Sequence, residues 1–206
     1  AAEHPGSDYP NFGTCHESLN TYNDQAVGNE FMGPTLWSSD PDIFALANDE
    51  AIEYLSNLWD VPSYQANLGS HLDMLHETPL CMGMAWESEN LYWVFNGKNG
   101  SIERVDFQAD HGPGFDDHDD GVIGRYVEGE VERVPDVPSH LILDESTGFL
   151  YIADTGKNAI KVLDTTSGVR GSDLSSMEWR VDHYQVDGAD VWTLIDGADA
   201  GLEQPS

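Results

Sequence analysis

The stretch LYWVFNGKNGSIERVDF at residues 91–107 decides the fold, because a second copy, LYIADTGKNAIKVLDT, lies at residues 150–165. The copies begin 59 residues apart (150 − 91 = 59), and the same offset aligns the Gly-Lys-Asn that begins at Gly97 with the one that begins at Gly156. In each copy, apolar residues lead to this tripeptide and a second apolar segment follows it, which predicts two strands joined by a tight turn. One hairpin cannot bury both of its faces, so the repeat predicts like units stacked on one another.

The repeat also extends toward the N-terminal side of each copy. Pro79 and Pro138 are 59 residues apart (138 − 79 = 59), and each precedes a short apolar segment. A unit therefore consists of a proline, a buried strand, a polar turn, a second strand, the Gly-Lys-Asn turn and a third strand. The stretch VPSHLILDESTGFLYIADTGKNAIKVLD at residues 137–164 resembles a blade of the NHL-repeat β-propeller family.

This resemblance implies an all-β fold in which four-stranded blades surround a central channel. We expect an NHL-like propeller that is incomplete, with about three to four blades, and one short inserted helix. Residues 202–206, LEQPS, resemble the opening of another unit, so further blades or chains are expected to complete the ring. The expected units are a diverged blade at 9–47, a helical insertion at 48–62, a blade at 76–107, an acidic loop insertion at 108–134, a blade at 135–165 and a partial blade at 177–206.

The inserted helix is expected at residues 49–58. Asn48 is a favourable N-cap residue, and Asp49 and Glu50 place negative charge in the first turn, where it suits the helix dipole. Leu55 and Trp59 recur at helical spacing, and Pro62 ends the segment.

The composition excludes some classes of function. The 206 residues include 38 acidic and only 8 basic side chains, for a net charge of −30. Nucleic-acid binding is excluded because phosphate contacts need Lys and Arg. No apolar run is long enough to span a bilayer, and no nucleotide-binding loop is present.

Two cysteines, Cys15 and Cys81, lie far apart in the sequence. In an oxidising compartment they are expected to form one disulfide that joins the N-terminal segment to the first strand of the first clear unit. The other interpretation is two buried free thiols. We expect an extracellular or periplasmic, secreted protein.

An acidic loop at residues 110–121 contains five Asp and two His. Asp116, His118 and Asp120 resemble the opening of a calcium loop, but Val127 stands where an EF-hand needs its bidentate Glu, which excludes an EF-hand. Two interpretations stay open. The loop is a calcium or transition-metal site with Asp110, Asp116, His118 and Asp120 as ligands, or it is simply solvated.

A second candidate metal site combines His71, Asp73 and His76 with His140. Residues just before the inner strands of a propeller lie near the mouth of its channel, so His76 and His140 are expected to converge on zinc or copper. This arrangement is similar to that of the peptidylglycine amidating lyase family, which implies channel histidines as zinc ligands and a metal-dependent lyase reaction. In that family the His directly follows the blade proline, whereas here Ser139 intervenes.

Asn99-Gly100-Ser101 is an N-glycosylation sequon. It falls on the hairpin turn, and the second copy keeps the Asn without the sequon, so turn chemistry explains the Asn as well as glycosylation does.

Two classes of function follow. The first is an extracellular or periplasmic binding or structural module, stabilised by calcium, that uses the propeller face for a protein or glycan partner. The alternative is a metal-dependent enzyme with channel histidines.

Overall fold

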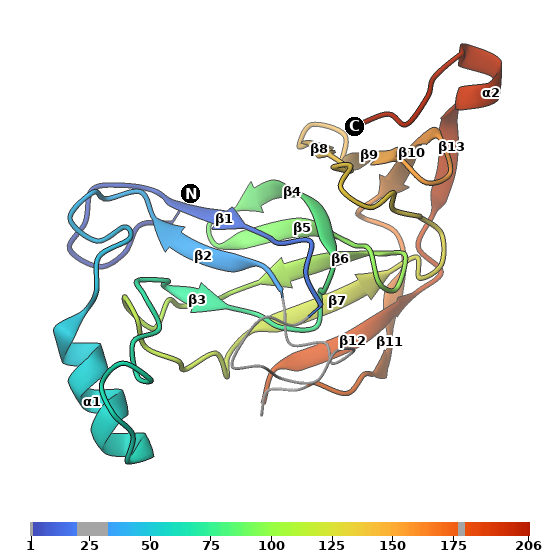
Figure 1. The fold of residues 1–206 in the computed structure, drawn as a ribbon. Helices are drawn as coiled ribbons and strands as arrows, with labels where there is room; N and C mark the ends of the chain where they lie inside the picture. Colours follow the sequence, from blue (N-terminus) through green and yellow to red (C-terminus); the bar gives the residue numbers. More distant parts are fainter. Residues whose placement is uncertain (1, 20–32, 177–179) are drawn as a thin grey trace.

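The computed structural model describes residues 2–19, 33–176 and 180–206. The regular structure of the described chain is mostly strand, with one long helix and one short helix (Figure 1). The elements are β1 (Asn11–Thr14), β2 (Thr35–Ser38), α1 (Asp49–Trp59), β3 (Asp73–Met74), β4 (Cys81–Ser88), β5 (Leu91–Asn96), β6 (Ser101–Asp106), β7 (Val122–Tyr126), β8 (Leu141–Asp144), β9 (Phe149–Asp154), β10 (Ala159–Asp164), β11 (Val169–Asp173), β12 (Asp182–Asp187), β13 (Val191–Asp196) and α2 (Gly197–Ala200).

The described strands form three separate sheets, and none of these closes on itself. The three-stranded sheet has the order β1-β2-β3, the six-stranded sheet β11-β12-β7-β6-β5-β4, and the four-stranded sheet β13-β10-β9-β8. Neighbouring strands are antiparallel except β7 and β12, which are parallel. The all-β class is therefore as expected, whereas the described part of the chain forms no closed ring.

The two copies of the repeat form the same three-stranded meander. β4, β5 and β6 pair in sequence order, as do β8, β9 and β10. Each hairpin turn has four residues, closed by the pair Asn96 and Ser101 in the first copy and by Asp154 and Ala159 in the second. The structural offset is thus 58 (154 − 96 = 58), because the second turn begins one residue earlier than the Gly-Lys-Asn alignment predicts.

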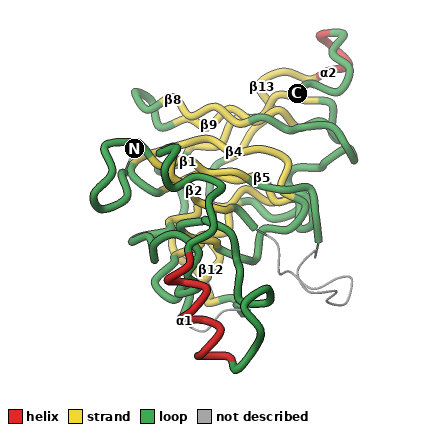
Figure 2. Tube along the Cα trace, turned by 60° about the vertical axis from the view of Figure 1, so that its left-hand side comes forward, coloured by secondary structure: helices red, strands yellow, loops and turns green. Residues whose placement is uncertain are grey.

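The sheets stack face to face through two apolar cores. One face of the six-stranded sheet, here called its front, packs against the four-stranded sheet (Figures 1 and 2). The opposite face, its back, packs against the three-stranded sheet. Alternation along β5 explains how one strand contributes to both cores, because successive side chains point to opposite faces. The first core includes Trp93, Phe95, Ile102, Leu150, Ile152 and Leu163, and the second includes Leu36, Leu72, Leu75, Tyr92, Val94 and Val105.

The helix α1 projects from the sheets beside the three-stranded sheet (Figure 2). It begins where the N-cap predicts, since the side chain of Asn48 accepts hydrogen bonds from the backbone of Glu50 and Ala51. It ends at Trp59, and the C-cap residue Asp60 adopts the left-handed conformation. Neither described helix is both long and apolar enough to cross a membrane.

Two of the expected units differ from the structure. Residues 108–134 are not only a loop, because they contain β7, which pairs with β6 as the next strand of its sheet. Residues 177–206 do not form a single partial unit, since β12 joins β7 while β13 joins β10. Residues 177–179 of that prediction, and residues 20–32 of the unit predicted at 9–47, lie outside the described residues.

A disulfide joins Cys15, which directly follows β1, to Cys81 at the start of β4. It spans a sequence separation of 66 and links the three-stranded sheet to the six-stranded one. The interpretation as two free thiols does not apply to this structure.

Candidate metal centre

Two segments meet beside the three-stranded sheet. One is the segment that leads into β3, and the other is the long connection between β6 and β7. Their backbones are hydrogen-bonded to each other, from His111 N to Leu72 O at 3.0 Å and from Gly114 N to His71 O at 2.9 Å. These bonds bring imidazoles from positions 40 residues apart (111 − 71 = 40) into contact.

Three histidines form the cluster: His71, His111 and His118. One ring nitrogen from each lies within 4.8 Å of those of the other two. The ring centroids are 5.0 Å apart for His71 and His111, 5.0 Å for His111 and His118, and 5.8 Å for His71 and His118. Nitrogens bound to one tetrahedral zinc at about 2.05 Å are about 3.4 Å apart, so a small inward movement of the rings suffices to hold an ion.

Backbone carbonyls orient two of the rings. The Nδ1 atom of His71 lies 3.1 Å from Leu68 O, and that of His111 lies 2.7 Å from Gly112 O. A carbonyl oxygen only accepts, so Nδ1 of each neutral ring carries the hydrogen and donates it. Nε2 then keeps its lone pair, which is the form that binds a metal.

His71 is kept neutral by its surroundings. Its side chain is almost fully buried, and burial, together with the neighbouring His118 and His76, lowers the pKa of His71 to about 4. The hydrogen bond to Leu68 opposes this shift. At neutral pH the ring is therefore unprotonated and able to act as a ligand.

The other members of the first predicted site lie around the cluster or away from it. The buried ring of His76 has its centroid 5.8 Å from that of His118. Asp73 is fully buried in β3, and its Oδ1 accepts a hydrogen bond from Met74 N. Thus His71 and His76 lie beside His118, which the sequence assigned to a different site.

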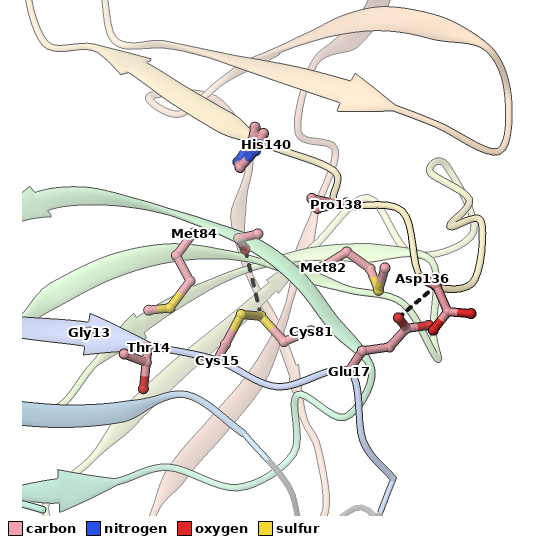
Figure 3. A pocket seen from close by; sticks show the side chains of 11 residues that line it. Gly13, Thr14, Cys15, Glu17, Cys81, Met82, Met84, Asp136, Pro138 and His140 are labelled. Atoms are coloured by element: carbon pink, nitrogen blue, oxygen red, sulfur yellow. Dashed lines mark hydrogen bonds between the residues drawn. A yellow bond between two sulfur atoms is a disulfide. The ribbon is translucent and has the colours of Figure 1, made fainter. Parts of the chain in front are cut away.

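His140 lies in a different place, and its predicted convergence with His76 is corrected by the structure. It is exposed and lines a pocket of about 500 Å³ between β1, β4 and the segment that leads into β8 (Figure 3). The Cys15–Cys81 disulfide, Met82 and Met84 line the same pocket, but His76 does not. His76 is buried beside His118, whereas His140 is exposed in this pocket.

The acidic residues of the predicted loop site are largely bound by protein donors. Oδ1 of Asp110 accepts from Gly112 N and is 2.7 Å from Nδ1 of His4. Oδ2 of Asp120 accepts from Ala109 N at 3.2 Å, and Asp116 is exposed. Asp110 and Asp120 line a hollow of about 310 Å³, together with Ala109, His111, Asp117, Asp119 and Arg180.

His111 is the ligand candidate that sequence reasoning did not single out. It lies in the same acidic loop as His118, seven residues earlier (118 − 111 = 7), and no metal-ligand spacing in the loop distinguishes it. The only feature of the sequence that could have indicated His111 was the presence of two histidines in the loop. Their convergence on His71 depends on backbone pairing between segments distant in the sequence.

The sequon asparagine, Asn99, is held within the turn. With its amide oriented to accept, its side-chain oxygen lies 2.9 Å and 3.2 Å from two nitrogens of Arg125. Its backbone oxygen accepts from Gly129 N. These contacts favour the turn interpretation of Asn99 over glycosylation.

No protein-family model, no curated protein and no solved structure was found to match the chain.

Proposed function

We propose that the protein binds a transition metal, zinc or copper, through His71, His111 and His118. The observation that carries the proposal is the approach of three imidazoles, with one nitrogen from each lying within 4.8 Å of the others. Two of these rings are set by backbone carbonyls so that Nε2 has its lone pair. Imidazole is a ligand suited to zinc and copper.

The same residues favour a transition metal over calcium. Calcium takes six to eight oxygen ligands, whereas the cluster offers nitrogen. The nearby carboxylates already bind protein donors: Asp110 faces His4, Asp120 faces a backbone N–H and Asp119 pairs with Arg180. Calcium stabilisation, which the sequence suggested, therefore receives less support than zinc or copper does.

Three protein ligands leave one position of a tetrahedral ion for water or substrate, as in catalytic zinc sites. His111 also lines the acidic hollow of about 310 Å³, so the cluster borders a space open to small molecules. These features support the metal-dependent enzyme as the function of this site. The amidating-lyase version with His140 as a ligand is not proposed again, because His140 lies in another pocket.

The binding or structural module remains a second proposal, and a different observation favours it. The edge strands β1 and β4 of two sheets, and the segment that leads into the edge strand β8 of the third, border one pocket (Figure 3). Sheets that stack face to face beside a common space are arranged like neighbouring propeller blades. The disulfide supports an oxidising compartment, extracellular or periplasmic, for either function.

The test is metal content by mass spectrometry after dialysis without chelator, followed by titration of the metal-free protein with zinc and with copper. We expect about one ion per chain in the wild type and at least a tenfold loss of affinity in His71→Gln, His111→Gln and His118→Gln. His140→Gln is the matched control and keeps the ion. Circular dichroism checks that each variant is folded.

Two results would overturn the proposal. One is the absence of zinc and copper binding in the folded wild type. The other is unchanged affinity in all three cluster variants, which would place any bound ion elsewhere.

A further inference from the structure

The outer face of the four-stranded sheet is apolar and carries exposed side chains on its two edge strands, β8 and β13, whereas Val162 and Ala153 in its middle are 1% and 9% exposed. Two rows of cross-strand partners run along this face, which points away from the six-stranded sheet. Ile142 is 68% exposed, Trp192 40% and Ile195 38%. The first row contains Ile142, Tyr151, Val162 and Trp192, and the second contains Ala153, Ile160 and Ile195.

The equivalent face of the six-stranded sheet is covered. At the structural offset of 58, Tyr151 corresponds to Trp93 (151 − 93 = 58) and Ile160 to Ile102 (160 − 102 = 58). Trp93 and Ile102 are 1% and 0% exposed. Their cover is the inner face of the four-stranded sheet, formed by Leu141, Leu150, Ile152 and Leu163.

The sheets stack in a fixed order, with equivalent faces pointing the same way. Leu150 and Leu163, on the inner face of the four-stranded sheet, correspond to Tyr92 and Val105 at the same offset of 58. Tyr92 and Val105 form the back of the six-stranded sheet and pack against the three-stranded sheet, on residues that include Leu36. The six-stranded and four-stranded sheets therefore turn equivalent positions toward the preceding sheet, and the six-stranded sheet turns its opposite positions toward the following one.

We propose that the outer face of the β8-β9-β10-β13 sheet docks a further antiparallel β-sheet unit of the same design. The contact face of that unit is aliphatic, like the one formed by Leu150, Ile152 and Leu163. The inference rests on the stacked arrangement proposed above and is independent of the metal centre. Burial of this apolar face drives the docking.

A second copy of this chain fits the face less well. The aliphatic face that would match is already buried in each copy, where it covers Trp93 and Phe95. Each copy also carries a net charge of −30, and two such surfaces repel one another.

The test supplies the proposed unit in tandem. Residues 140–206 are appended after Ser206, because Pro205-Ser206 corresponds to Pro138-Ser139 at the opening of the four-stranded unit. Ile142→Asp is then introduced at one of three places: in the single chain, in the first unit of the tandem chain, or in its appended copy. Urea unfolding followed by circular dichroism measures stability, and sedimentation equilibrium measures association.

We expect the substitution to leave the single chain and the appended copy almost unchanged, because the side chain is exposed there. In the first unit of the tandem chain it buries a carboxylate in an apolar interface. The ratio of unfolded to folded protein should then rise at least about tenfold.

Three outcomes would overturn the proposal. The appended unit could stay unfolded although the face is intact, or Ile142→Asp could change the unfolding equilibrium equally at all three places. The third is a single chain that dimerises through this face and no longer dimerises after Ile142→Asp. The last outcome would show that this face is the interface between two copies of the chain. Zinc content of the Ile142→Asp single chain reports on the metal proposal separately, since Ile142 lies outside the histidine cluster.

Discussion

Glu103 and Arg125 form a salt bridge inside the six-stranded sheet, with 2.8 Å between Oε1 and Nε and side chains that are 0% and 9% exposed. The carboxylate also accepts hydrogen bonds from Thr78, Asn96 and Ser101. This buried charge joins β6 and β7 to the segment that precedes β4. It is stable only while each of its oxygens has donors.

Arg125→Met should therefore lower the free energy of unfolding by about 3–5 kcal/mol, because it leaves the Glu103 carboxylate buried without its counter-charge. Urea unfolding measures the change. Arg170→Met is the control: the Arg170–Asp182 pair is 48% and 43% exposed, and its loss should barely move the midpoint. Equal effects of the two substitutions would contradict this role of the buried pair.

The sequence predicted the hairpins but not this pair. The hairpins follow from local patterns, since β5 and β9 are apolar strands that run into turn residues. Arg125 lies in β7, inside a segment whose acidic composition predicts a loop. Its strand forms because Ile123 and Tyr126 each have a cross-strand partner on β6, a contact that local composition does not encode.

The disulfide between Cys15 and Cys81 should stabilise the protein mainly by restricting the unfolded chain. For a separation of 66 residues the expected contribution is about 4 kcal/mol. The Cys15→Ser, Cys81→Ser double variant should lower the urea midpoint accordingly, and a reducing agent should lower that of the wild type but not that of the variant. A midpoint unaffected by the double substitution would show that the link adds no stability.

Gly100 occupies a position where a side chain is not tolerated. Its φ is 62°, and a Cβ atom there would lie 2.5 Å from Val131 O. Gly100→Ala should therefore destabilise the protein by about 1–3 kcal/mol, through both backbone strain and the clash, as urea unfolding can measure. Gly188→Ala is the matched control, because Gly188 has a φ of 69° and a Cβ atom there would meet no other atom within 4 Å. A larger loss at Gly188 would count against the steric explanation.

The sequence predicted only part of the metal centre. His71 and His118 were singled out as ligand candidates, but for two different sites. Their meeting depends on the hydrogen bonds from His111 N and Gly114 N to the segment before β3, at 3.0 and 2.9 Å. The spacing of these residues does not indicate that pairing, so local patterns offered no reason to choose His111. For His140 the sequence showed one departure, the Ser139 that intervenes after Pro138.

The lowered pKa of His71 should make the stability of the metal-free protein depend on pH. The ring has a pKa of about 4 in the folded protein and 6.5 in the unfolded chain, so the unfolded chain takes up the proton first as pH falls. Stability contributed by the neutral ring is complete above pH 6.5 and is lost between pH 6.5 and about 4. The loss amounts to about 3 kcal/mol, because one pKa unit corresponds to about 1.4 kcal/mol.

Urea unfolding with a chelator, at intervals between pH 7.5 and 4, measures this dependence as the difference between the wild type and His71→Asn. The difference should shrink toward the acid end of the range, because only the wild type has this buried ring to protonate. His140→Asn is the control: it removes an exposed imidazole and keeps His71, so it should keep the pH dependence that comes from the His71 ring. A constant difference between wild type and His71→Asn across the range would mean that burial does not hold this imidazole neutral.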